Sequence, residues 1–187
     1  MVEAVVALSA PDRRRLELPQ HVEALSTRRR FENMLDRHES GLRRLAFGML
    51  GDAHRVDDVL QDALLRAYLK LPTRFENERA EAAWLYRIVH RTCLNELRTR
   101  RRRREDELVA DDPRLASRGP DVASLVLAEA LATLPERARA VVLLVDVVGF
   151  DYETAAAVLR IRRGTVASRL NAARTSLRVA LGDEPDA

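Results

Sequence analysis

The chain of 187 residues is 47% hydrophobic, 33% charged and only 4% aromatic, a composition that allows a packed core and favours helices over a β-sandwich. One cysteine, Cys93, excludes an internal disulfide, and the four histidines show no ligand spacing, so we expect no metal and no cofactor. The net charge is +3, and Lys70 is the only lysine beside the arginines, whose side chain best fits phosphate groups and base edges.

The N-terminal part of the chain divides into a tail and three predicted helices. Residues 1–29 show weak periodicity, and we expect a disordered tail without an apolar run long enough for a signal sequence or a membrane span. Apolar residues then recur every three or four positions over 31–50, 56–71 and 84–97, and Pro72 ends the second run. Three such helices can bury a common core, and we expect a cytoplasmic protein.

Two segments of opposite charge separate these helices from the C-terminal part. Residues 98–104 hold six arginines and Thr99. Residues 105–121 hold two prolines, six acids and two arginines, so two positive charges less six negative ones give −4. The second segment predicts a linker. Helical spacing resumes over 122–182, and residues 183–187 are expected to be a short tail.

The last two predicted helices, 152–159 and 165–180, form a helix-turn-helix pattern, and Asp151 is placed to cap the first of them. No acidic residue occurs between Thr154 and Gly182, although solvated helices usually mix both signs of charge. A helix of one sign indicates a polyanionic partner. We interpret the last helix as one that binds DNA, in preference to a membrane-surface helix or a plain basic surface.

Three stretches of the sequence resemble one protein family. "LPERARAVVLLVDVVGFDYETAAAVLRIRRGTVASRLNAARTSLR", residues 134–178, resembles region 4 of the extracytoplasmic-function (group 4) sigma factors of bacterial RNA polymerase. "RVDDVLQDALLRAYLKL", residues 55–71, resembles region 2.2, and "AAWLYRIVHRTCLNELRTRRRR", residues 82–103, resembles regions 2.3 to 2.4. The resemblance implies an all-α fold of two small helical domains, region 2 at 30–104 and region 4 at 122–182, joined by a flexible acidic linker.

This resemblance implies a transcription initiation factor that directs core RNA polymerase to promoters and has no catalytic chemistry of its own. Its partners would be the clamp helices of the largest polymerase subunit, the flap of the second-largest subunit, promoter DNA and an anti-sigma factor, without membrane insertion. Carried onto this chain, the residues expected to dock on the polymerase are Asp58, Gln61, Asp62 and Arg66.

The same resemblance assigns two sets of DNA-binding residues. Arginine can hold guanine, and asparagine adenine, through two hydrogen bonds each. The residues expected to read the −35 duplex are Arg162, Arg163, Thr165, Ser168, Arg169, Asn171 and Arg174. The residues expected to capture and open the −10 element are Arg74, Phe75, Asn77, Tyr86, Arg87, Arg91, Asn95, Arg98 and Arg101. For Phe75, stacking on an extruded base and packing on Trp84 are both open at this point.

Other classes of function fit less of the sequence. An enzyme would need a convergent catalytic set, and we find no glycine-rich phosphate loop, no HExxH motif and no plausible triad. A helix-turn-helix regulator acting without core polymerase is the main alternative, and it predicts a dimer on a palindromic site. It leaves the aspartate-rich helix and the linker unexplained. A third class is a scaffold protein that binds its partners through helical faces only. For such a protein, Arg162→Glu would leave DNA-dependent activity unchanged.

Overall fold

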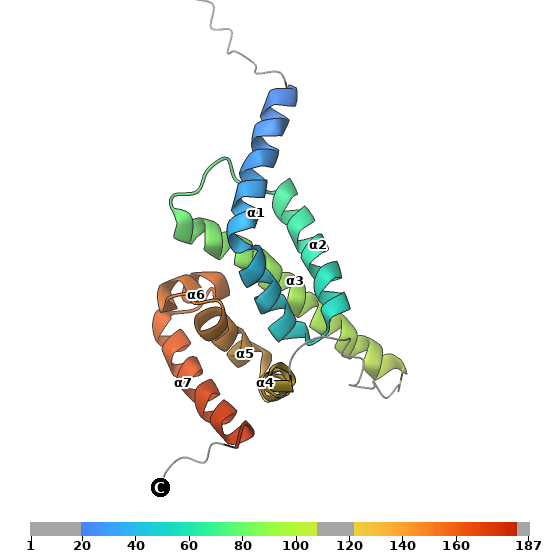
Figure 1. Cartoon of the computed structure of the whole chain (residues 1–187), viewed down its shortest axis with the longest axis vertical. Coiled ribbons are helices and arrows are strands. Elements are labelled where there is room, and N and C mark those ends of the chain that lie inside the picture. Colours follow the sequence, from blue (N-terminus) through green and yellow to red (C-terminus); the bar gives the residue numbers. More distant parts are fainter. Residues whose placement is uncertain (1–19, 108–121, 183–187) are drawn as a thin grey trace, which may run out of the picture.

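The computed structural model describes residues 20–107 and 122–182, and the regular structure within these ranges is helical throughout (Figure 1). The all-α prediction is therefore confirmed. None of the described helices is both long and apolar enough to cross a membrane. In chain order the elements are α1 (Gln20–Leu50), α2 (Ala53–Leu69), α3 (Glu78–Glu107), α4 (Val122–Thr133), α5 (Glu136–Val142), the π-helical turn η1 (Leu143–Val147), α6 (Tyr152–Leu159) and α7 (Arg163–Ala180).

Helices α1, α2 and α3 pack together as the N-terminal half (Figure 1). Gly51 ends α1 in the left-handed backbone region, at φ +70°. Asp52 then caps α2, because its Oδ1 accepts hydrogen bonds from the backbone N–H groups of His54 (3.0 Å) and Arg55 (3.4 Å). Leu42, Leu45, Met49, Val56, Leu85 and Val89 are buried as the apolar spacing predicted. Met34 and Tyr86 are also among the largest buried side chains, although the predicted spacing did not include them.

The N-terminal boundary of this half differs from the prediction. α1 begins at Gln20, so the last part of the predicted disordered tail is helical. An ion pair from Arg28 to Glu32, one turn later, supports this extension at 2.8 Å. The Nη2 of Arg30 also donates a hydrogen bond to the carbonyl oxygen of Pro72 at 2.7 Å, which ties the extension to the loop after α2.

Two further boundaries differ by a few residues. α3 continues to Glu107 and takes in the first three residues of the predicted linker. α7 begins at Arg163 rather than Thr165, because the carbonyl of Arg162 already accepts hydrogen bonds from the N–H groups of Thr165 (2.9 Å) and Val166 (3.1 Å). The predictions for the remaining tail and linker residues fall on 1–19, 108–121 and 183–187, which lie outside the described residues.

The C-terminal half consists of α4, α5, η1, α6 and α7. Asp151 caps α6 as predicted, with its Oδ1 accepting a hydrogen bond from the N–H of Thr154 at 2.8 Å. Between α5 and α6 the chain passes through η1 and then Gly149, which has φ +91°. This turn directs Phe150 toward the N-terminal half, where its ring meets that of Tyr86.

The two halves pack directly on one another. α6 lies against α3, while η1, α5 and α4 lie against α1 (Figure 1). The rings of Tyr86 and Phe150 meet edge to face at 4.7 Å, and the Nη1 of Arg139 donates a hydrogen bond to the carbonyl of Met49 at 3.1 Å. We call this set of contacts between α1 or α3 and the C-terminal half the junction. The sequence predicted two bundles but gave no sign that they pack together.

Candidate nucleic-acid and partner interfaces

The helix-turn-helix holds α7 with one side in the core and the other in solvent. Val166, Leu170, Ala173 and Leu177 are the buried residues of this helix. At about 100° per residue, Ser168 and Asn171 lie on the opposite side, and both are exposed. Sequence periodicity alone predicted this division. The outward side therefore offers hydroxyl and amide groups at positions that can enter a DNA groove.

Cationic groups gather at the N-terminal end of α7. Arg162 is the N-cap residue and Arg163 the first residue of the helix, and both side chains are exposed. Thr165 and Arg169 follow one turn apart and are partly exposed on one flank of the outward side. The unpaired N–H groups of a helix N-terminus and the adjacent guanidinium groups attract the same phosphate groups. This end of α7 can thus bind a DNA backbone and position the outward side chains over the bases.

Arg174, which the sequence also placed in the −35 set, is held by an ion pair within the protein. Its Nη2 and Nε pair with the two carboxylate oxygens of Asp146 in η1, at 2.5 and 3.1 Å. On the helix it lies about one turn after Asn171, on the flank of α7 opposite to Arg169. The side chain ties α7 to η1 in this structure, and its predicted contact with the −35 element stays a prediction.

Tyr86 of α3, which the sequence predicted to bind the −10 element, does not face solvent in this structure. Its side chain is buried, with 2% exposed, between α1 and Phe150. The hydroxyl donates a long hydrogen bond to the carbonyl of His38 at 3.4 Å, and burial raises the pKa of Tyr86 to about 12. The helical period alone did not reveal this burial, because Phe150 comes from the other half of the chain.

Arg87 lies in α3 next to Tyr86 and is turned toward α6. Its Nη2 donates a hydrogen bond to the carbonyl of Ala157 at 2.6 Å. Burial lowers the pKa of Arg87, and the nearby positive charge of Arg160 lowers it further. Arg160 occupies the turn between α6 and α7 in the left-handed backbone conformation, at φ 54°. The predicted DNA-binding side chain of Arg87 is therefore engaged within the protein.

The loop before α3 uses two of its predicted DNA-binding residues for packing and capping. The ring of Phe75 lies 5.3 Å from that of Trp84, so Phe75 packs on Trp84 in this structure. The Oδ1 of Asn77 accepts a hydrogen bond from the N–H of Ala80 at 2.8 Å and caps the start of α3. Arg74, the third member of the predicted set in this loop, has an exposed side chain.

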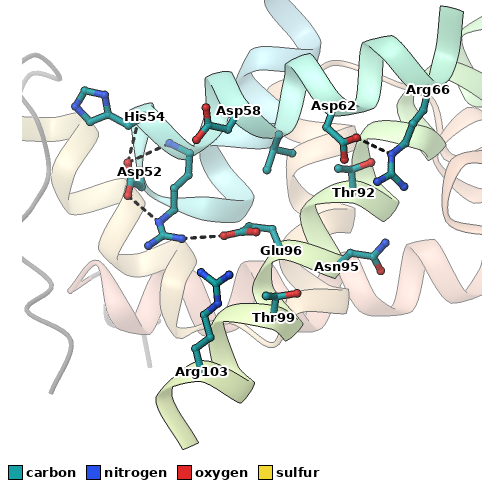
Figure 2. Close-up of a pocket in the computed structure, with 12 residues that line it drawn as sticks. Asp52, His54, Asp58, Asp62, Arg66, Thr92, Asn95, Glu96, Thr99 and Arg103 are labelled. Carbon is teal, nitrogen blue, oxygen red and sulfur yellow. Dashed lines mark hydrogen bonds and ion pairs between the residues drawn. The ribbon is translucent and has the colours of Figure 1, made fainter. Parts of the chain in front are cut away.

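The remaining predicted −10 residues lie further along α3. Arg91, Arg98 and Arg101 have exposed side chains, and Arg102 and Arg103 continue the exposed arginine run. Asn95 is also exposed, but it lines a groove between α3 and α2 (Figure 2). The second half of α3 is therefore the part that offers guanidinium groups to a nucleic acid.

The groove between α2 and α3 has a volume of about 680 Å³ and carries several carboxylates (Figure 2). Arg55 bridges Asp52 (3.1 Å) and Glu96 (2.8 Å), and Arg66 pairs with Asp62 (2.8 Å). Asp58 is exposed and makes no ion pair with any described residue. The rim of this groove thus presents an unpaired carboxylate to an incoming cationic side chain.

Three of the four predicted polymerase-docking residues, Asp58, Asp62 and Arg66, line this groove. Gln61 is exposed on the other flank of α2, where it lines a shallow depression with residues of α1. The sequence reading missed two leucines on the same exposed side of α2. Leu65 is 57% exposed and Leu69 is 72% exposed. Their signal in the sequence is that both fall outside the apolar stripe that α2 buries.

Family profiles match most of the chain. A profile described as Sigma-70 region 2 matches residues 34–103, and one described as Sigma-70, region 4 matches residues 124–177. Over 139 residues the chain is 37% identical to the ECF RNA polymerase sigma factor EcfG of Rhodopseudomonas palustris, covering 73% of this chain and 76% of EcfG. Over 153 residues it is 35% identical to SigM of Mycobacterium tuberculosis, covering 81% of this chain and 77% of SigM.

Two solved structures share the fold. The sigma factor RpoE from Bartonella quintana, solved with the anti-sigma factor NepR, aligns with a TM-score of 0.67 and 27% identity. The alignment covers 83% of this chain and 98% of that one. CnrH, solved with the cytosolic domain of CnrY, aligns with a TM-score of 0.63 and 25% identity, covering 89% of this chain and 98% of CnrH.

Proposed function

The chain belongs to the extracytoplasmic-function group of the sigma-70 family, and we propose that its two halves divide the work of promoter recognition between them. As a member of this family it is a transcription initiation factor that directs RNA polymerase to promoters. In the proposed division, α7 reads the −35 element as duplex DNA, α3 captures the −10 element, and α2 docks on core polymerase.

The observation that carries the proposal is the outward side of α7. Arg162, Ser168 and Asn171 are exposed there, and α7 contains no acid to neutralise its arginines from within the helix. The guanidinium groups neutralise phosphates and release counterions, while the amide and hydroxyl groups are free to contact base edges. Arg163, Thr165 and Arg169 complete this surface.

For the −10 element we propose Arg91, Asn95, Arg98 and Arg101, together with Arg74 of the preceding loop. Opening a duplex costs a few kcal/mol for each unstacked base step, so the displaced strand needs a surface that holds its phosphates. The exposed arginines of α3 are suited to that task. Arg87 joins this set only after its hydrogen bond to α6 is broken.

For polymerase docking we propose the exposed side of α2, with Asp58 and Asp62 as its charged groups and Leu65 and Leu69 as its apolar centre. Interfaces commonly combine buried apolar anchors with charged groups at the rim. Here the two leucines would be the apolar anchors. Gln61 and Arg66 flank this surface on its two sides. An apolar segment of the C-terminal half would meet the flap of the second-largest subunit.

We also propose that an anti-sigma factor binds this chain. RpoE and CnrH, which share its fold over most of their length, were each solved as complexes, RpoE with an anti-sigma factor and CnrH with the cytosolic domain of CnrY. Binding of such a protein to the isolated chain would compete with core polymerase. To measure that competition, an anti-sigma factor encoded beside this gene is titrated into a complex of the chain with core polymerase. The fraction of chain released from polymerase is the readout.

Run-off transcription with core polymerase tests the proposed function. The template is the DNA upstream of the chain's own coding sequence, and core polymerase alone is the reference. We expect a discrete transcript only when the folded chain is added. Absence of that transcript, or tight binding of a dimer to a palindromic duplex without polymerase, contradicts the proposal and supports the regulator alternative.

A further inference from the structure

The turn between α6 and α7 holds an arginine in a backbone conformation that arginine disfavours. Arg160 has φ 54° and ψ 47°, and among the residues that the structure describes it is the only one other than glycine with a positive φ. In this left-handed region the Cβ of an L-residue crowds the following carbonyl oxygen, a cost that glycine does not incur. Arg160 therefore occupies a position for which glycine is the better residue on conformational grounds.

The turn itself requires the left-handed conformation. The N–H of Ile161 donates a hydrogen bond to the carbonyl of Ala156 at 3.1 Å, and the N–H of Arg160 donates to the same carbonyl. Helices commonly end in this way, because a left-handed residue lets the chain satisfy the last carbonyl groups. Residues 160–162 then lead directly into α7, which packs against α6 (Figure 1). The backbone thus explains the conformation of residue 160 but not its arginine side chain.

The side chain of Arg160 gains no compensating contact inside the described part of the protein. It is exposed, and it makes no hydrogen bond or ion pair with any described residue. Its charge instead acts on a like charge: burial lowers the pKa of Arg87, and the positive charge of Arg160 is the second cause that lowers it. Both the backbone and the charge of Arg160 are therefore unfavourable in the free chain.

The carboxylates nearest in sequence to this turn are engaged elsewhere. Asp146 is paired with Arg174 through both of its oxygens, at 2.5 and 3.1 Å. Asp151 and Glu153 are paired across the junction with Arg79, at 2.9 and 2.5 Å. The turn therefore keeps a positive charge that these acids do not pair with.

Three exposed arginines gather at the turn. Arg160, Arg162 and Arg163 lie within four residues, and none of them forms an ion pair with a described residue. From Thr154 to Gly182 the sequence contains no acid. Like charges held this close repel one another unless a polyanion binds them. Each strand of a DNA duplex presents one phosphate about every 3.4 Å, so neighbouring arginines can each neutralise one of them.

We propose that Arg160 is a further DNA-binding residue, which contacts the sugar–phosphate backbone at the edge of the −35 element. In helix-turn-helix proteins the first helix crosses the DNA backbone while the second lies in the major groove. Arg160 directly follows the first helix, α6, so phosphate groups rather than base edges are its ligands. This inference rests on the proposed function for the −35 role of α7, but the sequence patterns that predicted that role did not include Arg160.

Three substitutions at residue 160 separate its charge from its backbone conformation. Arg160→Lys keeps both the charge and the backbone cost, Arg160→Gln removes the charge alone, and Arg160→Gly removes both. Arg178→Gln removes the same charge at an exposed position near the other end of α7 and is the matched control. Because glycine relieves the backbone cost, Arg160→Gly should raise Tm by about 2–4 °C. Weaker DNA binding by this variant then cannot arise from loss of the fold.

The first measurement is the affinity of the holoenzyme, the chain with core polymerase, for its promoter fragment at several salt concentrations. We expect Arg160→Gly and Arg160→Gln to bind about tenfold more weakly than wild type, because a charge-assisted contact is lost. The slope of log affinity against log salt should become shallower by about 0.9, the value for one phosphate. Arg160→Lys should restore most of the affinity, and Arg178→Gln should change neither quantity.

Two results of this measurement overturn the proposal. Unchanged affinity and salt slope in Arg160→Gly and Arg160→Gln would mean that the residue does not contact DNA, and would direct it to an acidic protein segment instead. A loss that is seen on the native −35 element but not on a fragment with a scrambled −35 element would mean that Arg160 reads a base, since a backbone contact adds affinity on both.

The second measurement locates the phosphate. Single phosphates of both strands around the −35 element are replaced in turn by neutral methylphosphonate, and the affinity of the holoenzyme is measured for each fragment. One replacement should weaken wild type by about tenfold and leave Arg160→Gln unaffected, because that variant already lacks the contact. Additive effects at every phosphate overturn the proposed contact. Failure of the wild-type holoenzyme to prefer its promoter over scrambled DNA counts instead against the proposed function.

Discussion

The arginines of α7 and those of α3 are held in different ways, although both helices carry candidate DNA-binding faces. In α7, Arg162 and Arg163 stand at an exposed helix N-terminus. In α3, Arg87 is bound to the backbone of α6 and its neighbour Tyr86 is buried. The α7 surface is available in the structure as it stands, whereas the first half of the α3 surface is not. The comparison indicates that the −35 surface is ready before the −10 surface.

The largest effect expected from this comparison is on α7. Arg162→Glu and Arg169→Glu each replace a cation that faces DNA with an anion. A base or phosphate contact of this type contributes about 1–3 kcal/mol, so each change should reduce −35-dependent transcription by about 5- to 150-fold. Run-off transcription at a fixed salt concentration measures the loss. Arg178→Glu, the same charge change near the other end of α7, is the control, and an equal loss there would refute a specific surface.

The next effect concerns α2, which neither DNA surface includes. Asp58→Arg and Leu65→Ser should each weaken binding to core polymerase by about tenfold, because interface anchors commonly contribute 1–2 kcal/mol or more. Fluorescence anisotropy with labelled chain and core polymerase gives the affinity. Asp36→Arg, at an exposed position of α1, makes the same change in charge elsewhere. Unchanged affinity in Asp58→Arg and Leu65→Ser would contradict the docking surface.

The two halves should also respond differently to pH. Burial lowers the pKa of His90 to about 4 and also lowers that of His38, and both residues lie in the N-terminal half. Unfolded histidine takes up a proton near pH 6.5, so between about pH 6.5 and 4 the unfolded chain binds more protons than the folded one. The free energy of unfolding should therefore decrease as the pH is lowered from about 6.5 to 4. For His90 the decrease should reach up to about 3 kcal/mol.

Urea denaturation at pH 7.5 and pH 5, followed by the fluorescence of Trp84, measures this loss for the N-terminal half. His90→Gln cannot take up the proton and should show a smaller difference between the two pH values. If wild type and His90→Gln lose the same free energy of unfolding on acidification, the buried neutral state of His90 is not the cause.

The smallest effect is expected at Arg174. Its pair with Asp146 lies on the surface, so Arg174→Ala should lower stability by no more than about 1 kcal/mol. Because the guanidinium is already paired with Asp146, affinity for the −35 duplex should change by less than about twofold. Arg169→Ala is the matched variant on the outward face. An equal drop in affinity for Arg174→Ala would return this residue to the DNA-binding set.

Local features of the fold were predictable from the sequence. The apolar spacing located the main helices, and Asp151 was recognised as a cap because capping depends on neighbouring residues only. Val166 and Leu170 marked the buried side of α7, so Ser168 and Asn171 followed as exposed residues. These inferences needed no knowledge of distant contacts.

The features that the sequence did not reveal depend on partners far along the chain. Tyr86 is buried by Phe150, and Arg87 reaches Ala157, 70 residues away. Helical periodicity describes one face of one helix and does not identify which distant element covers it. For Arg174 the decisive partner, Asp146, lies 28 residues away in a π-helical turn that no short pattern indicated.

The central claim is that α7 and α3 contact separate parts of one promoter, and cross-linking in the assembled holoenzyme tests it most directly. A photoreactive amino acid replaces Ser168 in one preparation and Arg98 in another, and the cross-linked nucleotides are mapped on the same promoter. The account predicts contacts of Ser168 near −35 and of Arg98 near −10, about 25 base pairs apart, which is about 85 Å of duplex. Cross-links from both positions to the same few base pairs, or from only one of them, would contradict it.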